Sequence, residues 1–374
     1  MSEHRDQLVV QVVPYYPPHV GGMENVARVV AEWLATKGPV EVLTSTSGQG
    51  ASPRVQHRGH LTVRRLSTRE IANVPVMPTL LYHLLRLPRD AVVHLHIAQA
   101  FVPEMVWLAA RLRRRPYIAH FHLDVEPSGR FGSVFVAYKR WVLGGVLRSA
   151  STVIVVSPDQ TDFVRRTYGV ATRRIRLIPN GVGQEFYRGP RPAPDHGGPF
   201  RMLFVGRLAR QKNVPRLLRA VASARAPLEL VLVGDGDDRP RLERLIGDLA
   251  LTNVRLVGAQ FGQPLVDWYG WADAFILTSD REGTGLVLLE AMAAGVPVIA
   301  NDVAGIRDTI GDDGILATTA PADLAMAIDR LAADPLLWED LSRRGSRRAD
   351  RFPWTVLFDS LEELYEETIS AVAD

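Results

Sequence analysis

The sequence has 374 residues, of which 47% are hydrophobic and 23% charged, an ordinary globular composition. It contains no cysteine, which excludes disulfides, thiolate metal ligands and cysteine nucleophiles. The formal net charge is only +3, and basic and acidic residues interleave instead of forming the basic stripe typical of nucleic-acid binding. The length favours two domains, because single cores stop growing near ~250–300 residues.

The apolar segments are too short for export or for a membrane span. The run Leu8–Val13 follows a charged start and is shorter than the apolar region of a signal peptide. The closest candidate for a membrane helix, Ala91–Ala110, is interrupted by His94, His96, Gln99 and Glu104. A membrane helix needs ~20 apolar residues. We therefore expect a cytoplasmic protein.

Short β-branched runs alternate with helical patterns along the chain. In the first half we expect strands at Leu8–Val13, Val40–Thr44, Val92–Ile97, Tyr117–Phe121, Thr152–Val156 and Ile175–Ile178. In the second half we expect them at Met202–Val205, Leu228–Val233, Val254–Val257, Ala274–Leu277 and Val296–Ala300. Apolar residues fall at helical spacing between them, as from Met23 to Leu34 and from Val102 to Leu112. This alternation predicts an α/β fold with parallel sheets and helices on both faces.

A segment rich in proline and glycine, residues 189–199, breaks this alternation near the middle of the chain. It has no periodic apolar positions, so we interpret it as a linker. It would join two doubly wound domains, residues 1–188 and 200–354, that face each other across a cleft. The last helix, residues 355–374, follows Pro353, and we leave open that it crosses back to the first domain.

The strongest functional signal lies in residues 280–300, where a predicted strand is followed by a loop and a helix. Gly283 and Gly285 allow the backbone to approach a ligand closely. The start of the helix presents free N–H groups to an anion. Parallel sheets bind ligands at this position, outside the carboxyl ends of their strands.

Two glutamates flank the start of this helix. Glu282 alone could be an acidic residue that suits a helix N-terminus. Glu290, however, interrupts the apolar run Leu286–Met292, where a charge is costly without a partner. We therefore expect one carboxylate to reach a sugar and the other to hold a ribose.

Other glycine and cation clusters occur at predicted strand ends. Gly206 and Arg207 end a strand, and Lys212, one of three lysines in the chain, follows five residues later. Two cations there could neutralise a diphosphate leaving group, although a solvated charge run is the alternative. Gly21 and Gly22 open the first helix and on their own indicate only a turn. The chain lacks the G-x-G-x-x-G fingerprint of a dinucleotide site.

Glu282, seven intervening residues and Glu290 resemble the two-glutamate motif of retaining glycosyltransferases with the GT-B fold. This family, glycosyltransferase family 4-like or glycosyl transferases group 1, includes bacterial mannosyl- and glucosyltransferases and sucrose-phosphate synthase. The similarity covers nearly the whole chain. It includes the segments Tyr16–Glu24, Ile178–Val182, Val205–Leu208, Lys212–Asn213, Leu232–Gly236 and Asn301–Ile306.

The resemblance implies a role for each matching residue. It implies that Glu290 holds the donor ribose hydroxyls, that Glu282 contacts the donor sugar, and that Arg207 and Lys212 lie on the pyrophosphate next to Gly206. The remaining donor contacts would come from the loop of Gly21 and Gly22, from the backbone of Gly283, Thr284, Gly285 and Leu286, and from His122, aligned through Pro116–Ala119.

The chain departs from the family pattern at three positions. Thr284 stands where an aromatic residue is common. Asp308 stands where a glutamate is usual, and Gly183 where an aspartate often follows Asn-Gly-Val.

Two groups of residues raise the question of a metal. The pairs His94 and His96, and His120 and His122, each share one face of a predicted strand. Imidazoles can bind zinc, but no third kind of ligand lies nearby in the sequence, so we favour strand ends that line a polar cleft. The motif Asp235–Asp237 resembles a divalent-metal site of other glycosyltransferases, yet it reads as a solvated turn. We expect no metal.

We interpret the chain as a metal-independent, retaining hexosyltransferase. Its co-substrate would be a UDP- or GDP-linked sugar, with no separate cofactor, and its acceptor a saccharide, a lipid or a small natural product. A sugar-nucleotide epimerase or phosphorylase with the same fold, and a catalytically silent sugar-nucleotide-binding protein, are the alternatives. The arginines at 111 and 113–115 and the leucines of residues 80–87 leave open a weak peripheral contact with a membrane.

Overall fold

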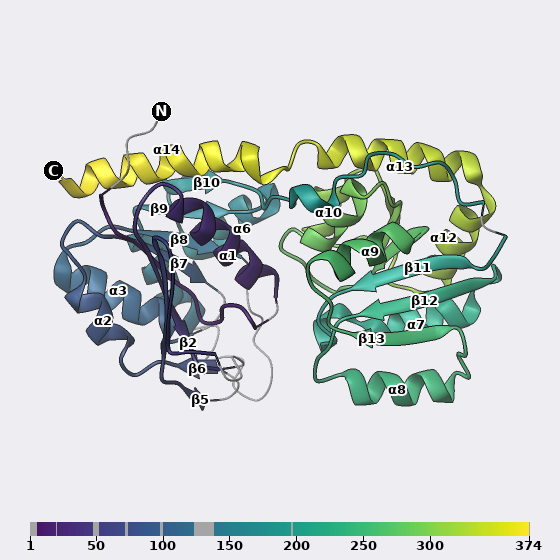
Figure 1. Ribbon diagram of the computed structural model, residues 1–374, viewed down its shortest axis with the longest axis horizontal. Helices are drawn as coiled ribbons and strands as arrows, with labels where there is room; N and C mark the ends of the chain where they lie inside the picture. The colour runs from purple at the N-terminus through teal and green to yellow at the C-terminus, as the bar shows by residue number, and fades with distance from the viewer. Residues whose placement is uncertain are drawn as a thin grey trace. The chain divides into compact units, whose positions relative to one another are not determined.

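The computed structural model describes residues 6–19, 21–47, 52–71, 74–97, 100–122, 138–195 and 197–373. Val20 of the first glycine motif, His196 of the predicted linker and Gln99 lie outside these ranges. The chain forms two compact units. The first contains the residues up to Ile178 together with those from Phe358 onward, and the second spans Pro179–Leu357. Each is a Rossmann-like α/β unit, with helices packed against its own sheet (Figure 1).

The first unit is built on an eight-stranded sheet with the order β10-β9-β8-β7-β1-β2-β4-β3. All neighbours pair in parallel except β3 and β4. The strands are β1 Val9–Val12, β2 Val40–Ser45, β3 Val55–Arg58, β4 Leu61–Leu66, β7 Val92–Ile97, β8 Tyr117–Phe121, β9 Thr152–Val155 and β10 Ile175–Leu177, and a separate antiparallel pair is formed by β5 Arg69–Ile71 and β6 Val74–Val76.

The helices of this unit are α1 Gly22–Ala35, α2 Leu80–Arg86, α3 Val102–Arg113, α5 Gly144–Ser149 and α6 Pro158–Tyr168, with a π-helical turn η1 Lys139–Leu143 and a 3-10 turn η2 Thr172–Arg174. In this sheet β2 lies on one side of β1, whereas β7, β8, β9 and β10 follow one another on its other side. Right-handed crossovers therefore place α1 on one face and α3, α5 and α6 on the other. The apolar face of β7 and β8 packs with α2, α3 and α5, through residues such as Val93, Leu95 and Ala119.

The second unit has a fully parallel six-stranded sheet with the order β13-β12-β11-β14-β15-β16. Its strands are β11 Phe200–Val205, β12 Leu228–Val233, β13 Val254–Gly258, β14 Ala274–Leu277, β15 Val298–Asn301 and β16 Ile315–Ala317. Its helices are α7 Val214–Ser223, α8 Arg239–Asp248, α9 Gln263–Trp271, α10 Leu286–Ala293, α11 Ile306–Ile310, α12 Pro321–Ala333 and α13 Pro335–Ala349, with 3-10 turns η3 Gln184–Phe186 and η4 Arg210–Lys212.

The last helix, α14 Trp354–Ala373, begins in the second unit and continues in the first. Within the first unit its aromatic residues pack on α1 and on β7. Phe358 stacks on Trp33 with ring centroids 4.6 Å apart. Tyr365 lies against His94. These contacts explain why residues from Phe358 onward cluster with the first unit.

The predicted linker does not separate the units. Residues 189–199 belong to the second unit, and the chain passes between the units at Ile178–Pro179 and at Leu357–Phe358. Arg188 N–H donates to the Ala293 carbonyl at 3.0 Å, and Arg191 N–H donates to Ser342 Oγ at 2.9 Å. Backbone donors in the proline-rich segment and immediately before it therefore hold this segment on the second unit, which composition alone does not reveal.

All eleven predicted strands are present, with ends that differ by up to two residues. The largest shifts are at β11, which begins at Phe200 instead of Met202, and at β15, which begins at Val298 instead of Val296. Five further strands, β3 to β6 and β16, were not predicted from the sequence. Four of them have three or four residues, and exposed β3 and β5 lack apolar alternation. In the described residues, no helix combines the length and apolar character needed to cross a bilayer.

Candidate functional site

Two loops of the second unit meet at the carboxyl edge of its sheet, because β11 and β14 are parallel neighbours. The loop after β11 carries Gln211, and the loop after β14 carries Asp280 and Arg281. Asp280 N–H donates to the Gln211 carbonyl at 2.9 Å. Gln211 Nε2 donates in return to the Arg281 carbonyl at 2.8 Å. These reciprocal bonds hold the two loops in register.

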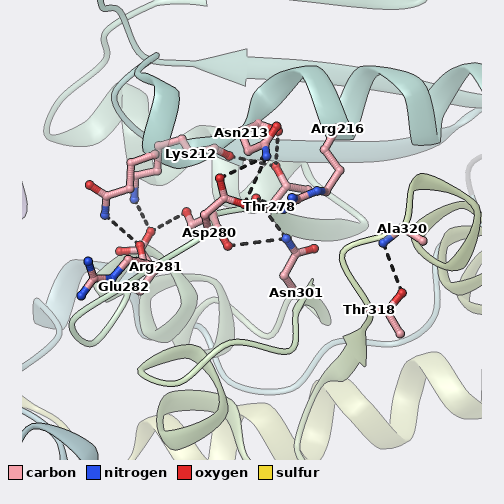
Figure 2. A network of polar contacts seen from close by, with 12 residues as sticks. Lys212, Asn213, Arg216, Thr278, Asp280, Arg281, Glu282, Asn301, Thr318 and Ala320 are labelled. Atoms are coloured by element: carbon pink, nitrogen blue, oxygen red, sulfur yellow. Dashed lines mark hydrogen bonds and ion pairs between the residues drawn. The ribbon is translucent and has the colours of Figure 1, made fainter. Parts of the chain in front are cut away.

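Side chains beneath the loops reinforce this connection (Figure 2). Asn213 Nδ2 lies 3.1 Å from both carboxylate oxygens of Asp280, and Arg216 Nη1 lies 2.8 Å from Asp280 Oδ1. Thr278 Oγ1 donates to the Lys212 carbonyl at 3.1 Å. Asn301 Nδ2, at the end of β15, donates to the Thr278 carbonyl at 3.1 Å. Three neighbouring strands thus fix the backbone that carries the candidate site.

Lys212 and Glu282 form an ion pair at one side of this network (Figure 2). The Lys212 ammonium contacts Glu282 Oε1, and Ser279 Oγ donates to the same oxygen at 2.6 Å. The side chains are only 19% and 10% exposed, so the pair is shielded from water on most sides. The structure therefore brings together two predicted site residues from separate loops. Ser279 was missed, since no pattern in the sequence marks it.

Helix α10 begins at Leu286, shortly after Glu282 in the chain. Gly285 caps the helix in a left-handed conformation, with φ near 51°, where a side chain would be strained. A Cβ atom at Gly305 would lie 2.2 Å from the Glu282 carbonyl oxygen, so only glycine allows that loop to approach. The backbone from Gly283 to Leu286 is consequently held at the helix N-terminus, where N–H groups lack helical partners.

Thr284, which replaces the aromatic residue common in the family, is buried beneath this backbone. Its hydroxyl accepts a hydrogen bond from Asn180 Nδ2 at 2.7 Å. Its carbonyl accepts one from Thr309 Oγ1 at 2.6 Å. Thr284 is therefore tied to two other segments of the second unit through both its side chain and its main chain.

Glu290 lies one turn into α10 and is 8% exposed. Tyr269 on α9 donates a hydrogen bond to Glu290 Oε2 at 2.7 Å. Burial raises the pKa of Glu290 to about 7, a rise opposed by the Tyr269 hydrogen bond and increased by the nearby charge of Glu185. The pKa of Tyr269 is raised as well, chiefly by burial, so it stays a donor. Tyr269 is the hydrogen-bond partner that a buried carboxylate needs, and sequence spacing could not identify it.

Arg207 and Gly206 follow β11 directly, on the same strand end as Lys212. The Arg207 side chain is exposed, whereas Gly206 lies against Lys212. The Asp-x-Asp motif lies on the neighbouring loop after β12. Asp235 Oδ1 accepts a hydrogen bond from Gly236 N–H at 2.8 Å, which is an ordinary turn contact.

The predicted residues of the first unit are Gly21, Gly22 and His122. Gly21 caps α1, and Glu24 folds back over it, close enough that a Cβ atom at Gly21 would lie 2.1 Å from Glu24 Oε2. His19 Nδ1 lies 2.8 Å from the other Glu24 oxygen. His122 follows β8, and its Nε2 lies 2.9 Å from His96 Nδ1.

The four histidines of β7 and β8 form one cluster. Within the described residues, His94, His96 and His120 are the set of side chains whose ligand atoms lie close enough to suggest a metal, within 4.8 Å of one another. The sequence offers only histidines here, with no third kind of ligand nearby, and His120 is opposite His96 in the sheet. Burial lowers the pKa of all four imidazoles, to about 3 for His94 and His122.

A family model described as "Glycosyltransferase Family 4" matches residues 20–186, and one described as "Glycosyl transferases group 1" matches residues 199–334. The chain belongs to this family of glycosyltransferases. The resemblance on which the sequence analysis relied is thereby confirmed, and the two matches fall on the two Rossmann-like sheets.

Similar proteins cover almost the whole chain. A D-inositol 3-phosphate glycosyltransferase of Paenarthrobacter aurescens is 27% identical over 94% of this chain and 94% of its own length. A GDP-mannose-dependent α-mannosyltransferase of Mycolicibacterium smegmatis is 28% identical over 96% and 97%. The sucrose-phosphate synthase structure from Thermosynechococcus elongatus superposes with a TM-score of 0.77 at 24% identity, covering 98% of this chain and 100% of that one. The glycosyltransferase has the GT-B fold of its structural neighbours.

Proposed function

We propose that this glycosyltransferase moves a hexosyl or related sugar from a nucleotide-diphosphate sugar to an acceptor hydroxyl, with retention of configuration and without a divalent metal. The observation that carries the proposal is the contact between Lys212 and Glu282 at the start of α10. It places a cation, a carboxylate and free helix N–H groups together, while the same helix carries buried Glu290. A donor has one chemical group for each of them: a diphosphate, a sugar and a ribose.

The charge that develops during the reaction indicates which part of the donor the cations stabilise. The bond between the anomeric carbon and the diphosphate oxygen breaks, and the diphosphate leaves with additional negative charge. Arg207, Lys212 and the N–H groups at the start of α10 stabilise that charge. The acceptor oxygen bonds to the anomeric carbon on the same face, and its proton passes to the departing phosphate. No side chain is assigned as the general base.

The carboxylates and the histidine bind the rest of the donor. Glu282 contacts the sugar, where positive charge develops as the leaving group departs. Glu290 accepts hydrogen bonds from the ribose hydroxyls. We assign His122 to the donor sugar, and the loop of Gly21 and Gly22 to the donor as well. The second unit is thus the donor unit and the first the acceptor unit.

A thermal-shift comparison of UDP, GDP and ADP tests the donor assignment. Binding stabilises the folded protein by RT ln(1 + [L]/Kd), about 2.7 kcal/mol at a hundredfold excess over Kd. The name of the relative from M. smegmatis supports a GDP-linked sugar as one candidate. That of the relative from P. aurescens supports a phosphorylated polyol as one acceptor among saccharides, lipids and natural products. Failure of all three nucleotides to stabilise the protein would contradict the proposal.

Product analysis tests the reaction class. With the stabilising nucleotide sugar and a panel of acceptors, we expect a glycoside whose anomeric configuration, read by NMR, matches that of the donor. Release of a free epimer, or of a sugar phosphate in the presence of phosphate, would indicate the epimerase or phosphorylase alternative. Absence of both transfer and donor hydrolysis would indicate a binding protein.

A cytoplasmic location and a weak membrane contact are also part of the proposal. Leu108 and Leu112 on α3 and Trp141 on η1 are exposed, and basic residues adjoin them in the sequence. Such a mixture suits the surface of an anionic bilayer. Co-sedimentation with anionic but not with neutral vesicles is the expected result. Equal recovery in the supernatant with both would remove this part of the proposal.

A further inference from the structure

The orientation of a buried amide, that of Gln11 on β1, is set by the main chain of α1. Gln11 is fully buried, and its amide lies between the Ala27 carbonyl and the Ala31 N–H. A carbonyl can only accept and an N–H can only donate. The Gln11 nitrogen therefore faces the Ala27 carbonyl at 3.0 Å, and the Gln11 oxygen faces the Ala31 nitrogen at 3.2 Å. The opposite orientation would set like groups against each other.

This orientation determines where His96 carries its proton. The Gln11 nitrogen also lies 3.2 Å from His96 Nε2, so Nε2 must accept the hydrogen bond. His96 is fully buried, and burial holds its pKa far below the ordinary value, so the ring is neutral and has one N–H group. With Nε2 as an acceptor, the proton is on Nδ1.

The position of the proton on His96 in turn determines its position on His122. His96 Nδ1 lies 2.9 Å from His122 Nε2, and with the proton on His96 Nδ1 the His122 nitrogen accepts. The two rings are nearly parallel, at 11°, with centroids 5.2 Å apart. Burial lowers the pKa of His122 to about 3, so this ring is neutral too. Its single proton is therefore on Nδ1.

We propose that Gln11 and His96 are positioning residues that fix the tautomer of His122, so that His122 presents Nδ1–H as a hydrogen-bond donor to an oxygen of the donor sugar. This inference rests on the proposed function, since it takes His122 as the donor-sugar contact. The consequence is a defined specificity: the contacted sugar atom must be an acceptor. Neutral His122 cannot take a proton from the acceptor hydroxyl at Nδ1, which agrees with a reaction that has no side-chain base.

The histidine cluster does not support a metal site instead. Imidazole lone pairs lie in the plane of the ring, so parallel rings can aim at one ion only if they are coplanar. His94 and His96 are 19° apart in orientation, with centroids at 4.4 Å, too close for coplanar rings. Both nitrogens of His96 are also engaged in the hydrogen bonds above. Ring stacking organises the four side chains, and hydrogen bonds engage His94, His96 and His122.

The test reads the tautomer directly. Long-range proton–nitrogen correlation spectra of 15N-histidine-labelled protein distinguish a protonated from a bare ring nitrogen, and the His122→Asn spectrum identifies the His122 signals by their loss. We expect His122 to carry its proton on Nδ1 in the wild-type protein. A proton on Nε2 would overturn the inference, whatever the activity.

Two variants of His96 provide the matched pair. His96→Leu removes the donor to His122 Nε2, and we expect mixed tautomers at His122 with a loss of roughly two- to tenfold in donor kcat/KM, the worth of one neutral hydrogen bond. In His96→Asn the amide nitrogen replaces Nδ1, so the His122 tautomer and most of the activity should be retained. Equal losses in both variants would assign His96 a merely structural role. If His122→Asn itself transfers sugar normally while the wild-type tautomer is as expected, the proposed contact between His122 and the donor sugar is wrong. The assignment of the His122 tautomer to Gln11 and His96 then still holds.

Discussion

The buried carboxyl of Glu290 should make donor binding depend on pH near neutrality. Its pKa of about 7 leaves the group about half protonated at neutral pH. Ribose hydroxyls donate to a carboxylate, so binding favours the ionised form. The ionised fraction is about one tenth at pH 6 and about nine tenths at pH 8, so the apparent Kd should fall roughly tenfold across this interval.

Isothermal titration calorimetry with a nucleotide sugar measures this directly. The diphosphate of a nucleotide sugar is a diester and has no proton that titrates near neutral pH, so changes in affinity report on the protein. Glu290→Gln is the matched control, because Gln keeps the shape and a hydrogen bond from Tyr269 but cannot ionise. We expect its affinity to be weaker and nearly independent of pH. A wild-type affinity that is constant from pH 6 to 8 would refute the reasoning.

The ligand-free protein should show the opposite trend. Glu290 binds its proton more tightly in the folded chain than at its ordinary pKa of 4.5, so its contribution to stability is fully present below that pH and is lost as pH rises through about 7. The interval between these two pKa values corresponds to roughly 3 kcal/mol of folding free energy. Glu290→Gln removes this loss and should unfold at higher denaturant concentration than wild type at pH 8, but not at pH 5. Parallel stability curves for the two proteins would contradict the raised pKa.

Three further predictions concern the same site. Arg207→Ala and Lys212→Ala should each weaken binding of the nucleotide diphosphate far more than that of the nucleoside, since their proposed partner is the pyrophosphate; equal losses in calorimetry would place them elsewhere. In steady-state kinetics at saturating acceptor, Glu290→Gln should mainly raise donor KM, by roughly ten- to a hundredfold for lost hydrogen bonds to a charged group, whereas Glu282→Gln should mainly lower kcat. The reverse pattern would exchange their roles. A chelator should leave transfer unchanged, and loss of activity that magnesium or manganese restores would show that the reaction needs a divalent metal.

Much of the fold was predictable because its strands are buried on both faces. Ala274–Leu277 is continuously apolar, and Leu228–Val233 is apolar except for Glu229; each is an internal strand with the predicted bounds. Strands β3 and β5 escaped prediction because they are short and exposed, so their pairing depends on neighbours that are distant in sequence. The boundary between the units escaped for a similar reason. Proline and glycine content marks an irregular segment but does not reveal what its backbone contacts.

The predictable part of the candidate site consists of residues whose chemistry follows from their type and their spacing in the sequence. The two glutamates, the glycine loop and Lys212 were named from the sequence, and the structure joins Lys212 to Glu282. What the sequence could not provide were the partners supplied by other elements. Ser279 and Tyr269 donate to the two glutamates from a neighbouring position and from another helix, respectively. The conformation of the loop after β14 and the packing of α9 on α10 determine which of the many hydroxyls in the chain lie there.

The pairing of Lys212 with Glu282 bears on how a donor enters the site. In the ligand-free chain the two opposite charges meet in a place that is largely shielded from water, so neither is left as an uncompensated buried charge. In the proposed reaction, a diphosphate would bring its own negative charge to the lysine, and the glutamate would then be free to contact the sugar as positive charge develops there. The hydrogen bond from Ser279 to Glu282 would limit the cost of that exchange. The ion pair is therefore a ligand-free arrangement of the same groups that the proposed reaction uses separately.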